Sequence, residues 1–210
     1  MFIHQIEKVT FSWSLSNNVG FPVGTVLNPR EVRTTADLEL LRQYPNDYFV
    51  LKANIDFSQS INALEQNFTP IGTKESPFRG TFVGQGDDST NYYINGINSF
   101  QGGLFGYIQN AHIEKIHLTN CRVTATSNIT EQNLYGDYVG MLVNVNNNSV
   151  IKKCSVTNIS SVTGFGSHIG LFVGLNKGII RECTASGIVS NGDLPTSLKK
   201  IRANPVYSYH

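Results

Sequence analysis

The sequence has 210 residues with 16 basic and 15 acidic side chains, which gives a formal net charge of +1. Its 15% charged and 40% hydrophobic residues argue against a disordered chain and against a nucleic-acid partner, and they predict one folded domain with a weakly charged surface. Asparagine is in clear excess, with 22 copies. Because asparagine tolerates left-handed backbone and binds nearby main chain, this excess predicts many tight turns or stacked side-chain amides.

Residues 1–33 are expected to form an arm or an added strand, since apolar residues alternate from Val9 to Leu15. The beginning of the sequence lacks an apolar stretch of signal-peptide length, and no segment reaches the roughly 18 to 20 apolar residues of a membrane span. We therefore expect neither an export signal nor a membrane span. A single helix is expected from Thr34, its N-cap, to Tyr44, and Pro45 ends it.

After the helix, short runs rich in aromatic and β-branched residues predict strands. Glycine, proline and asparagine separate these runs and leave little room for further helices. The runs are Tyr48–Leu51, Ile55–Phe57, Thr69–Gly72, Pro77–Gly84 and Tyr93–Ile97. They predict early, irregular turns of a pattern that the later sequence repeats more regularly.

Three later segments are internal repeats, which begin at Gly102, Gly140 and Gly170. Each contains a short glycine-bounded apolar run, then a turn, then a second run rich in isoleucine and valine. In the second run apolar and polar residues alternate, which predicts strands with one face turned inward. The first repeat is longer, and its polar stretch Thr124–Asp137 is expected to be an outward loop.

One such repeat cannot bury its apolar face alone, but copies stacked about 4.8 Å apart share a continuous core. We therefore expect an all-β protein, a right-handed parallel β-helix of a few coils over residues 34–190. The expected helix would cap its N-terminal side, and residues 191–210 would form a C-terminal cap or tail with a candidate second helix at 195–203. Strand edges left uncovered at the ends could also join chains into oligomers.

The three cysteines include no C-x-x-C pair, so neither a disulfide framework nor a zinc knuckle is expected. We expect free, buried thiols instead. Cys154 and Cys183 fall at equivalent positions of adjacent repeats, with Ile116 in the repeat before. A column of packed side chains is the favoured interpretation, although residues so placed also approach disulfide range. Cys121 is out of this register and is expected to be incidental.

The order of these motifs resembles the GLUG-motif repeat proteins, a family found in bacterial surface adhesins and beside the peptidase domain of immunoglobulin-A-cleaving metallopeptidases. The resemblance covers roughly residues 34 to 190 and rests mainly on Phe78–Gly84, Gly103–Gly106 and Gly170–Cys183. The sequence departs from the family pattern where Met141 and Leu171 replace a glycine of a Gly-Gly pair, where Asn144 replaces another glycine, and where Lys153 and Glu182 replace the asparagine before the cysteine.

The resemblance implies a β-helix scaffold used for binding and implies no reaction. It also implies that the protein is secreted or lies on the surface of a bacterium. Because no export signal is expected, a cytoplasmic protein or one exported by a route other than Sec is the alternative.

Known catalytic and phosphate-binding signatures are absent from the sequence, and no cofactor or metal is expected. His112 and His117 are expected on opposite faces of one strand, which does not suit a shared metal ion. The pair Asp87 and Asp88 could bind calcium, but a solvated turn is the favoured interpretation.

Candidate ligand-binding residues are exposed aromatic and amide side chains, which suit sugars or a protein partner. For the tyrosines, packing of loops onto the body is the alternative, and for the asparagine run the alternative is a turn with left-handed residues. The candidates are Tyr92, Tyr93, Tyr135, Tyr138, Asn146, Asn147 and Asn148.

The leading hypothesis is a non-enzymatic module that recognises a carbohydrate or a protein, from a host or another partner, through loops on a β-helix. The first alternative is a polysaccharide lyase or glycoside hydrolase, which needs carboxylates or basic residues that converge on one groove. The 15 acidic residues form no pair at the repeat spacing, which argues against it. The second alternative is a secreted effector or a structural component of a phage or secretion particle.

Overall fold

The structure is a computed structural model that describes residues 21–58, 66–84, 91–125, 138–158, 160–164 and 168–191. Several expectations lie outside these residues: the alternating segment within residues 1–20, the candidate helix at 195–203, most of the loop at 124–137, and Asp87, Asp88 and Tyr135.

The described strands form four sheets in which all pairings between named strands are parallel. The expectation of an all-β fold built from parallel strands is confirmed. The seven-stranded sheet contains β1 (Arg30–Val32), β2 (Tyr48–Leu51), β4 (Thr81–Gly84), β7 (Phe105–Gln109), β8 (His112–Glu114), β12 (Val143–Lys152) and β16 (Val173–Arg181). The five-stranded sheet contains β3 (Ile55–Asp56), β5 (Tyr93–Asn95), β9 (His117–Thr119), β13 (Ser155–Thr157) and β17 (Thr184–Ala185).

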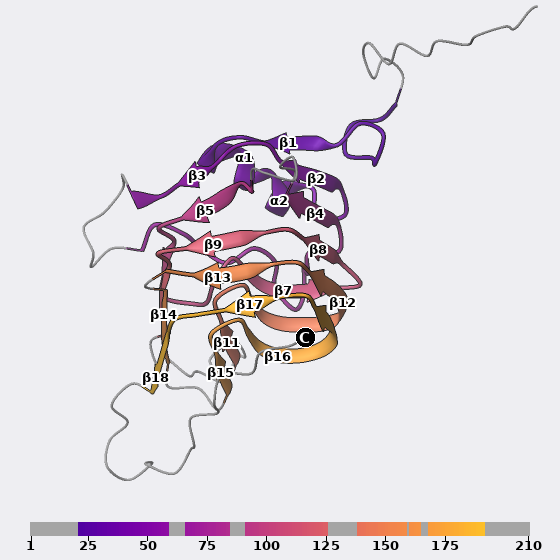
Figure 1. Cartoon of the computed structure of the whole chain (residues 1–210). Helices are drawn as coiled ribbons and strands as arrows, with labels where there is room; N and C mark the ends of the chain where they lie inside the picture. The colour runs from indigo at the N-terminus through magenta and orange to yellow at the C-terminus, as the bar shows by residue number, and fades with distance from the viewer. Residues whose placement is uncertain are drawn as a thin grey trace, which may run out of the picture.

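The remaining strands form a four-stranded and a two-stranded sheet. The four-stranded sheet contains β6 (Asn98–Ser99), β10 (Arg122–Thr124), β14 (Ser161–Gly164) and β18 (Ile188–Asn191), and the two-stranded sheet contains β11 (Tyr138–Gly140) and β15 (His168–Gly170). Within the described residues, the chain visits the seven-, five- and four-stranded sheets in this order four times, through β4, β5 and β6, then β8, β9 and β10, then β12, β13 and β14, then β16, β17 and β18. Figure 1 shows the resulting solenoid-like arrangement, with β5, β9, β13 and β17 one below another.

The core lies between the sheets and is filled by the inward residues of each strand. In the five-stranded sheet, Ile94, Leu118 and Val156 are in register and fully buried, while their neighbours along each strand face outward. This is the alternation that the repeats predicted. Nearer the first strands the core is aromatic, because the ring of Phe78 packs against those of Phe49 and Phe105, with centroids 6.2 and 5.2 Å apart.

Two short helices, α1 (Thr35–Leu38) and α2 (Leu40–Gln43), replace the single helix expected from Thr34 to Tyr44. The side chain of Thr34 caps α1 as predicted, in a capping box with Asp37. The helix is interrupted at Glu39, whose N–H binds the carbonyl of Ala36 three residues back. Leu38 and Leu41 are fully buried, and Figure 1 shows both helices at the β1 and β2 end of the stack.

The corners between the sheets explain the excess of asparagine. Non-glycine residues with φ between 50 and 56° occur at equivalent corners of successive turns, namely Asn110 and Asn148, Lys115, Lys153 and Glu182, and Asn120 and Asn158. The side-chain amide of Asn148 also donates to Oδ1 of Asn110 in the previous turn, over 2.8 Å. Both predicted uses of asparagine, left-handed turns and stacked amides, are therefore confirmed.

All three cysteines are free and buried, as predicted. The expectation that Cys121 is incidental is wrong, because it takes the same place at one corner that Cys154 and Cys183 take at another. Each thiol donates to the carbonyl two residues earlier over 3.2 Å, from Cys121 to Thr119, from Cys154 to Lys152 and from Cys183 to Arg181. The thiols therefore help to hold the corners.

Candidate functional site

The candidate site is the outer face of the five-stranded sheet, which carries uncharged polar side chains in rows. Tyr93, His117 and Ser155 are aligned in one row by the strand register, and Asn95, Thr119 and Thr157 in the next. We call these six residues the polar face. Their side chains face outward because Ile94, Leu118 and Val156, between them along the strands, are buried in the core.

Tyr93 is the exposed aromatic residue of the polar face, with 41% of its surface accessible. Its backbone N–H donates to Oδ1 of Asn54 over 3.1 Å, which anchors the start of β5. The preceding Tyr92 is half-buried and packs against the core instead. Of the two adjacent tyrosines expected to bind a ligand, the structure therefore places Tyr93 on the surface of the sheet.

The ring of His117 is held beside Tyr93 and Ser155. Its Nδ1 lies 2.7 Å from Oγ of Ser155, while its Nε2 is buried and has no hydrogen-bond partner among the described residues. Burial lowers the pKa of His117, and the positive charge of Lys115 lowers it further. The imidazole is therefore neutral near pH 7, so it adds no charge to the polar face.

Hydrogen bonds between turns fix the second row. The amide of Asn95 donates to Oδ1 of Asp56 over 2.8 Å, and its own oxygen accepts from the amide of Asn120 over 2.8 Å. In the next turn Asn158 donates to Oγ1 of Thr119 over 3.0 Å. These bonds orient the polar groups in advance, so little ordering remains to be done when a ligand binds.

Asp56 lies at the edge of the second row and is exposed. Hydrogen bonds from Ser58 and Asn95 lower the pKa of its carboxyl group below the usual value. The carboxylate therefore acts as an acceptor that holds the Asn95 amide in place.

Tyr93 is the residue of the polar face that the sequence predicted to bind a ligand, whereas the other residues of this face were not predicted. The missed residues are Asn95, His117, Thr119, Ser155 and Thr157. The alternation in the repeats already separated them from the inward residues, and the equivalence of successive repeats would have aligned them. That combination was the signal for this surface.

Tyr138 lies in another sheet. It is half-buried in β11, and its ring stacks on His168 of β15 with centroids 4.9 Å apart. The structure therefore does not bring it together with Tyr93 on one sheet face.

The asparagine run is part of the long strand β12. Asn146 is fully buried, donates to Oδ1 of Asn176 over 2.7 Å and accepts from the N–H of Ser149, while Asn147 is half-buried. Asn148 is exposed and has φ of 56°, as the turn interpretation predicts. The amide of Asn146 is therefore engaged inside the stack.

The outer face of the seven-stranded sheet carries charges. Oε2 of Glu114 lies 2.9 Å from Nε2 of His112, and Oε1 lies 3.7 Å from Nζ of Lys152. Although burial raises it, the pKa of Glu114 is below its usual value because His112 donates a hydrogen bond and Lys152 is close. The outer face of the seven-stranded sheet is therefore charged, whereas the polar face is uncharged.

The expectation that His112 and His117 lie on opposite faces of one strand is wrong. The left-handed residue Lys115 turns the chain between them, so they lie in β8 and β9 of two different sheets. Within the residues that the structure describes, no group of three or more histidine, cysteine or acidic side chains could hold a metal ion.

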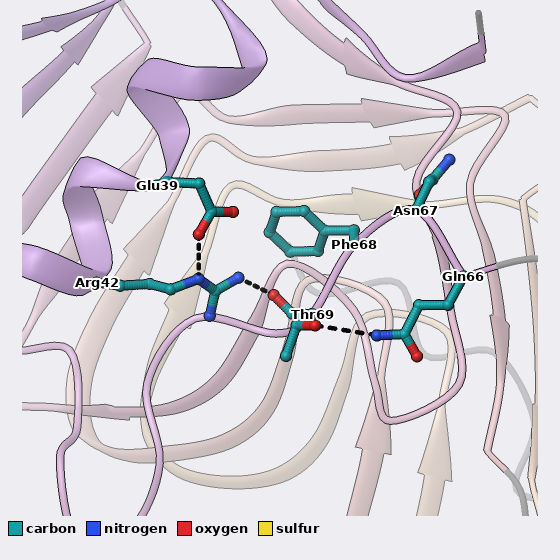
Figure 2. Close-up of a pocket in the computed structure, with 6 residues that line it drawn as sticks. All are labelled: Glu39, Arg42, Gln66, Asn67, Phe68 and Thr69. Atoms are coloured by element: carbon teal, nitrogen blue, oxygen red, sulfur yellow. Dashed lines mark hydrogen bonds and ion pairs between the residues drawn. The ribbon is translucent and has the colours of Figure 1, made fainter. Parts of the chain in front are cut away.

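A hollow of about 470 Å³ lies beside α2 and is lined by Glu39, Arg42, Gln66, Asn67, Phe68 and Thr69. Figure 2 shows the Arg42 guanidinium between Glu39 and Thr69. It binds Oε2 of Glu39 at 2.6 Å and the carbonyls of Thr69 and Pro70, and it lies 5.4 Å from the ring centre of Phe68. Arg42 is thus committed to holding the chain, which makes this hollow a weaker candidate than the polar face.

Comparisons with known proteins are sparse. No family model matches the sequence, and no solved structure matches it. A protein of Evansella cellulosilytica, named as a Gly-rich membrane protein, is 31% identical to it over 104 residues. The match covers 48% of this chain and only 12% of that relative. In the described part of the chain, no helix combines the length and the apolar character that crossing a membrane requires.

Proposed function

We propose that the chain is a non-enzymatic recognition module that binds a neutral carbohydrate on the polar face. The observation that carries this proposal is the pair of uncharged rows, in which Tyr93 offers an exposed ring beside oriented amide and hydroxyl groups. Amides and hydroxyls both donate to and accept from sugar hydroxyls, and an aromatic ring can stack on the apolar face of a sugar.

The proposed scaffold is a right-handed parallel β-helix, of the kind that the GLUG-motif resemblance implies. Support for it comes from the in-register parallel pairing, from the repeated order of the three sheets and from the equivalent left-handed corners. A location on the surface of a bacterium or outside it is part of the proposal. It is supported by the same resemblance and by the name of the Evansella relative.

The described acidic residues favour binding over hydrolysis. Seven of them are engaged by a basic side chain or by backbone N–H groups: Glu31, Asp37, Glu39, Asp47, Asp56, Glu114 and Glu182. A glycoside hydrolase needs two carboxyl groups about 5 to 10 Å apart around the substrate, one of them with a raised pKa. Glu114 instead faces a histidine and a lysine and has a lowered pKa.

The test is an array of neutral oligosaccharides probed with the full chain and matched variants. The wild type is expected to retain a set of glycans, and Tyr93→Phe to retain the same set. Tyr93→Ala is expected to weaken binding about fivefold, since losing a stacked ring costs on the order of 1 kcal/mol. Tyr44→Ala is the matched control, because Tyr44 is also 41% exposed but lies at the end of α2, outside the polar face.

Three outcomes would overturn the proposal. A blank array with a pull-down that depends on Tyr93 would point to a protein ligand. Release of reducing ends from a retained glycan would point to the hydrolase or lyase. Equal binding by Tyr93→Ala and the wild type would show that the glycan does not bind on the polar face.

A further inference from the structure

The cysteine column offers chemistry that the proposed binding face does not use. Cys154 and Cys183 occupy directly paired positions of adjacent turns, because the register joins Lys152 to Arg181 on one side of them and Ser155 to Thr184 on the other. The N–H of Cys154 donates to Sγ of Cys183 over 3.4 Å. Both side chains are buried, with 1% and 5% of their surfaces exposed.

The pairing places the two residues within reach of a disulfide. Paired residues of neighbouring parallel strands lie about 4.8 Å apart, inside the Cα separation of about 4.4 to 6.8 Å that disulfides span. Exchange with an external thiol reduces a disulfide, which makes such a modification reversible.

We propose that Cys154 and Cys183 form a reversible disulfide between adjacent turns when the protein meets a peroxide. Cys183 is the residue that reacts first, since it lies in the last described turn of the stack and its side chain is the less buried of the two.

The electrostatics of the pair agree with this order of reaction. A hydrogen bond from Cys154 lowers the pKa of the Cys183 thiol, whereas burial raises the pKa of Cys154. The thiolate form is the nucleophile in cysteine oxidation. Cys183 is therefore the thiol that reaches the reactive form at the lower pH.

The reaction balances in two steps. The Cys183 thiolate attacks one oxygen of hydrogen peroxide, so that an S–O bond forms, the O–O bond breaks and hydroxide leaves. The sulfur of Cys154 then loses its proton and attacks the Cys183 sulfur, which forms the S–S bond and expels the oxygen as water. Overall, two thiols are oxidised and one peroxide is reduced to two waters.

Cys121 provides an internal control. It is as buried as Cys154, and burial raises its pKa to about 11. Its paired position in the next turn is Ser160, whose Oγ accepts the Cys121 N–H, so it has no thiol beside it there. It should neither join the disulfide nor react early.

The experiment oxidises the folded, reduced full chain with hydrogen peroxide, then denatures it, alkylates the free thiols and maps the peptides without reduction. The expected product links Cys154 to Cys183 and leaves Cys121 alkylated, so that two of the three thiols are lost. Dithiothreitol should restore all of them. Cys121→Ala should give the same cross-link, and Cys183→Ala should give none.

Two results would overturn the proposal. One is full alkylation of Cys154 and Cys183 after peroxide treatment of the wild type, and the other is a sulfinic acid or a link to Cys121 in place of the cross-link. The wild-type peptide map decides the matter even if a variant fails to fold. Because glycan binding is measured separately on the reduced protein, failure of this proposal and failure of the proposed function are distinguishable.

Discussion

The backbone N–H of Cys121 donates to the side-chain Oγ of Ser160, the corner residue of the next turn, over 3.2 Å. The same relationship joins successive turns at other corners, from Ala111 to Oγ of Ser149, from Ile116 to Sγ of Cys154 and from Cys154 to Sγ of Cys183. At each of these corners, a small inward side chain of the next turn therefore accepts a hydrogen bond from a buried N–H that has no carbonyl partner in the strand pairing.

Ser160→Ala should destabilise the fold, because it leaves the buried N–H of Cys121 without this acceptor. The expected loss in the free energy of unfolding is about 1 to 3 kcal/mol. Ser186→Ala is the control, since Ser186 is exposed and its change should stay within about 0.5 kcal/mol. Urea denaturation followed by circular dichroism measures both, and equal midpoints would contradict the corner argument.

Lys115→Asn should stabilise the protein. Lys115 has φ of 54°, a left-handed conformation that costs an ordinary residue about 1 to 2 kcal/mol and that asparagine adopts more readily. A gain of about 0.5 to 1 kcal/mol is expected, whereas Lys115→Val should lose stability. Lys177→Asn, in the extended strand β16, should bring no gain, and a gain of similar size there would show that the backbone conformation is not the cause.

Gly84→Ala should be poorly tolerated. A Cβ at this position would lie 1.9 Å from the carbonyl oxygen of Lys115 in the next turn, so the backbone would have to move. The expected cost is about 1 to 3 kcal/mol, seen as a lower melting temperature. Thr81→Ala in the same strand is the comparison, because Thr81 is only half-buried. An unchanged melting temperature for Gly84→Ala would mean that the two turns do not approach this closely.

His117 should make stability depend on pH. Its pKa in the folded protein lies below the usual 6.5, so between the two values the unfolded chain binds more protons and the free energy of unfolding rises with pH. Its contribution is fully present above pH 6.5 and is lost as the pH falls toward the folded pKa. His117→Gln should flatten this slope in melting curves recorded from about pH 5 to about pH 7.5, and an unchanged slope would assign it to other groups.

Much of the fold could be predicted from the sequence because the repeats carry a period-two alternation. The inward and outward residues of β9 and β13 follow it, with Leu118 and Val156 inside. The corner between β8 and β9 could not be predicted in this way, since Lys115 carries no turn signal of its own. Only its alignment with Lys153 and Glu182 at equivalent corners marks it.

The candidate site was harder to predict than the fold. Its contacts join residues far apart in the sequence, such as His117 and Ser155, which are 38 positions apart. A single candidate binding residue such as Tyr93 can be predicted from its residue type alone. Its neighbours across the sheet can be predicted only when the register of the strands is known. The register depends in turn on a left-handed residue at each corner, and composition alone does not place those residues.

The parallel pairing also determines how the molecule would respond to mechanical force. Bonds such as those between β12 and β16 run from one turn to the next, whereas the covalent chain runs around the stack. Tension applied to the two ends would therefore load the hydrogen bonds first and peel off one turn after another. The protein should extend in discrete steps, as an uncoiling spring does, and should not rupture in a single event.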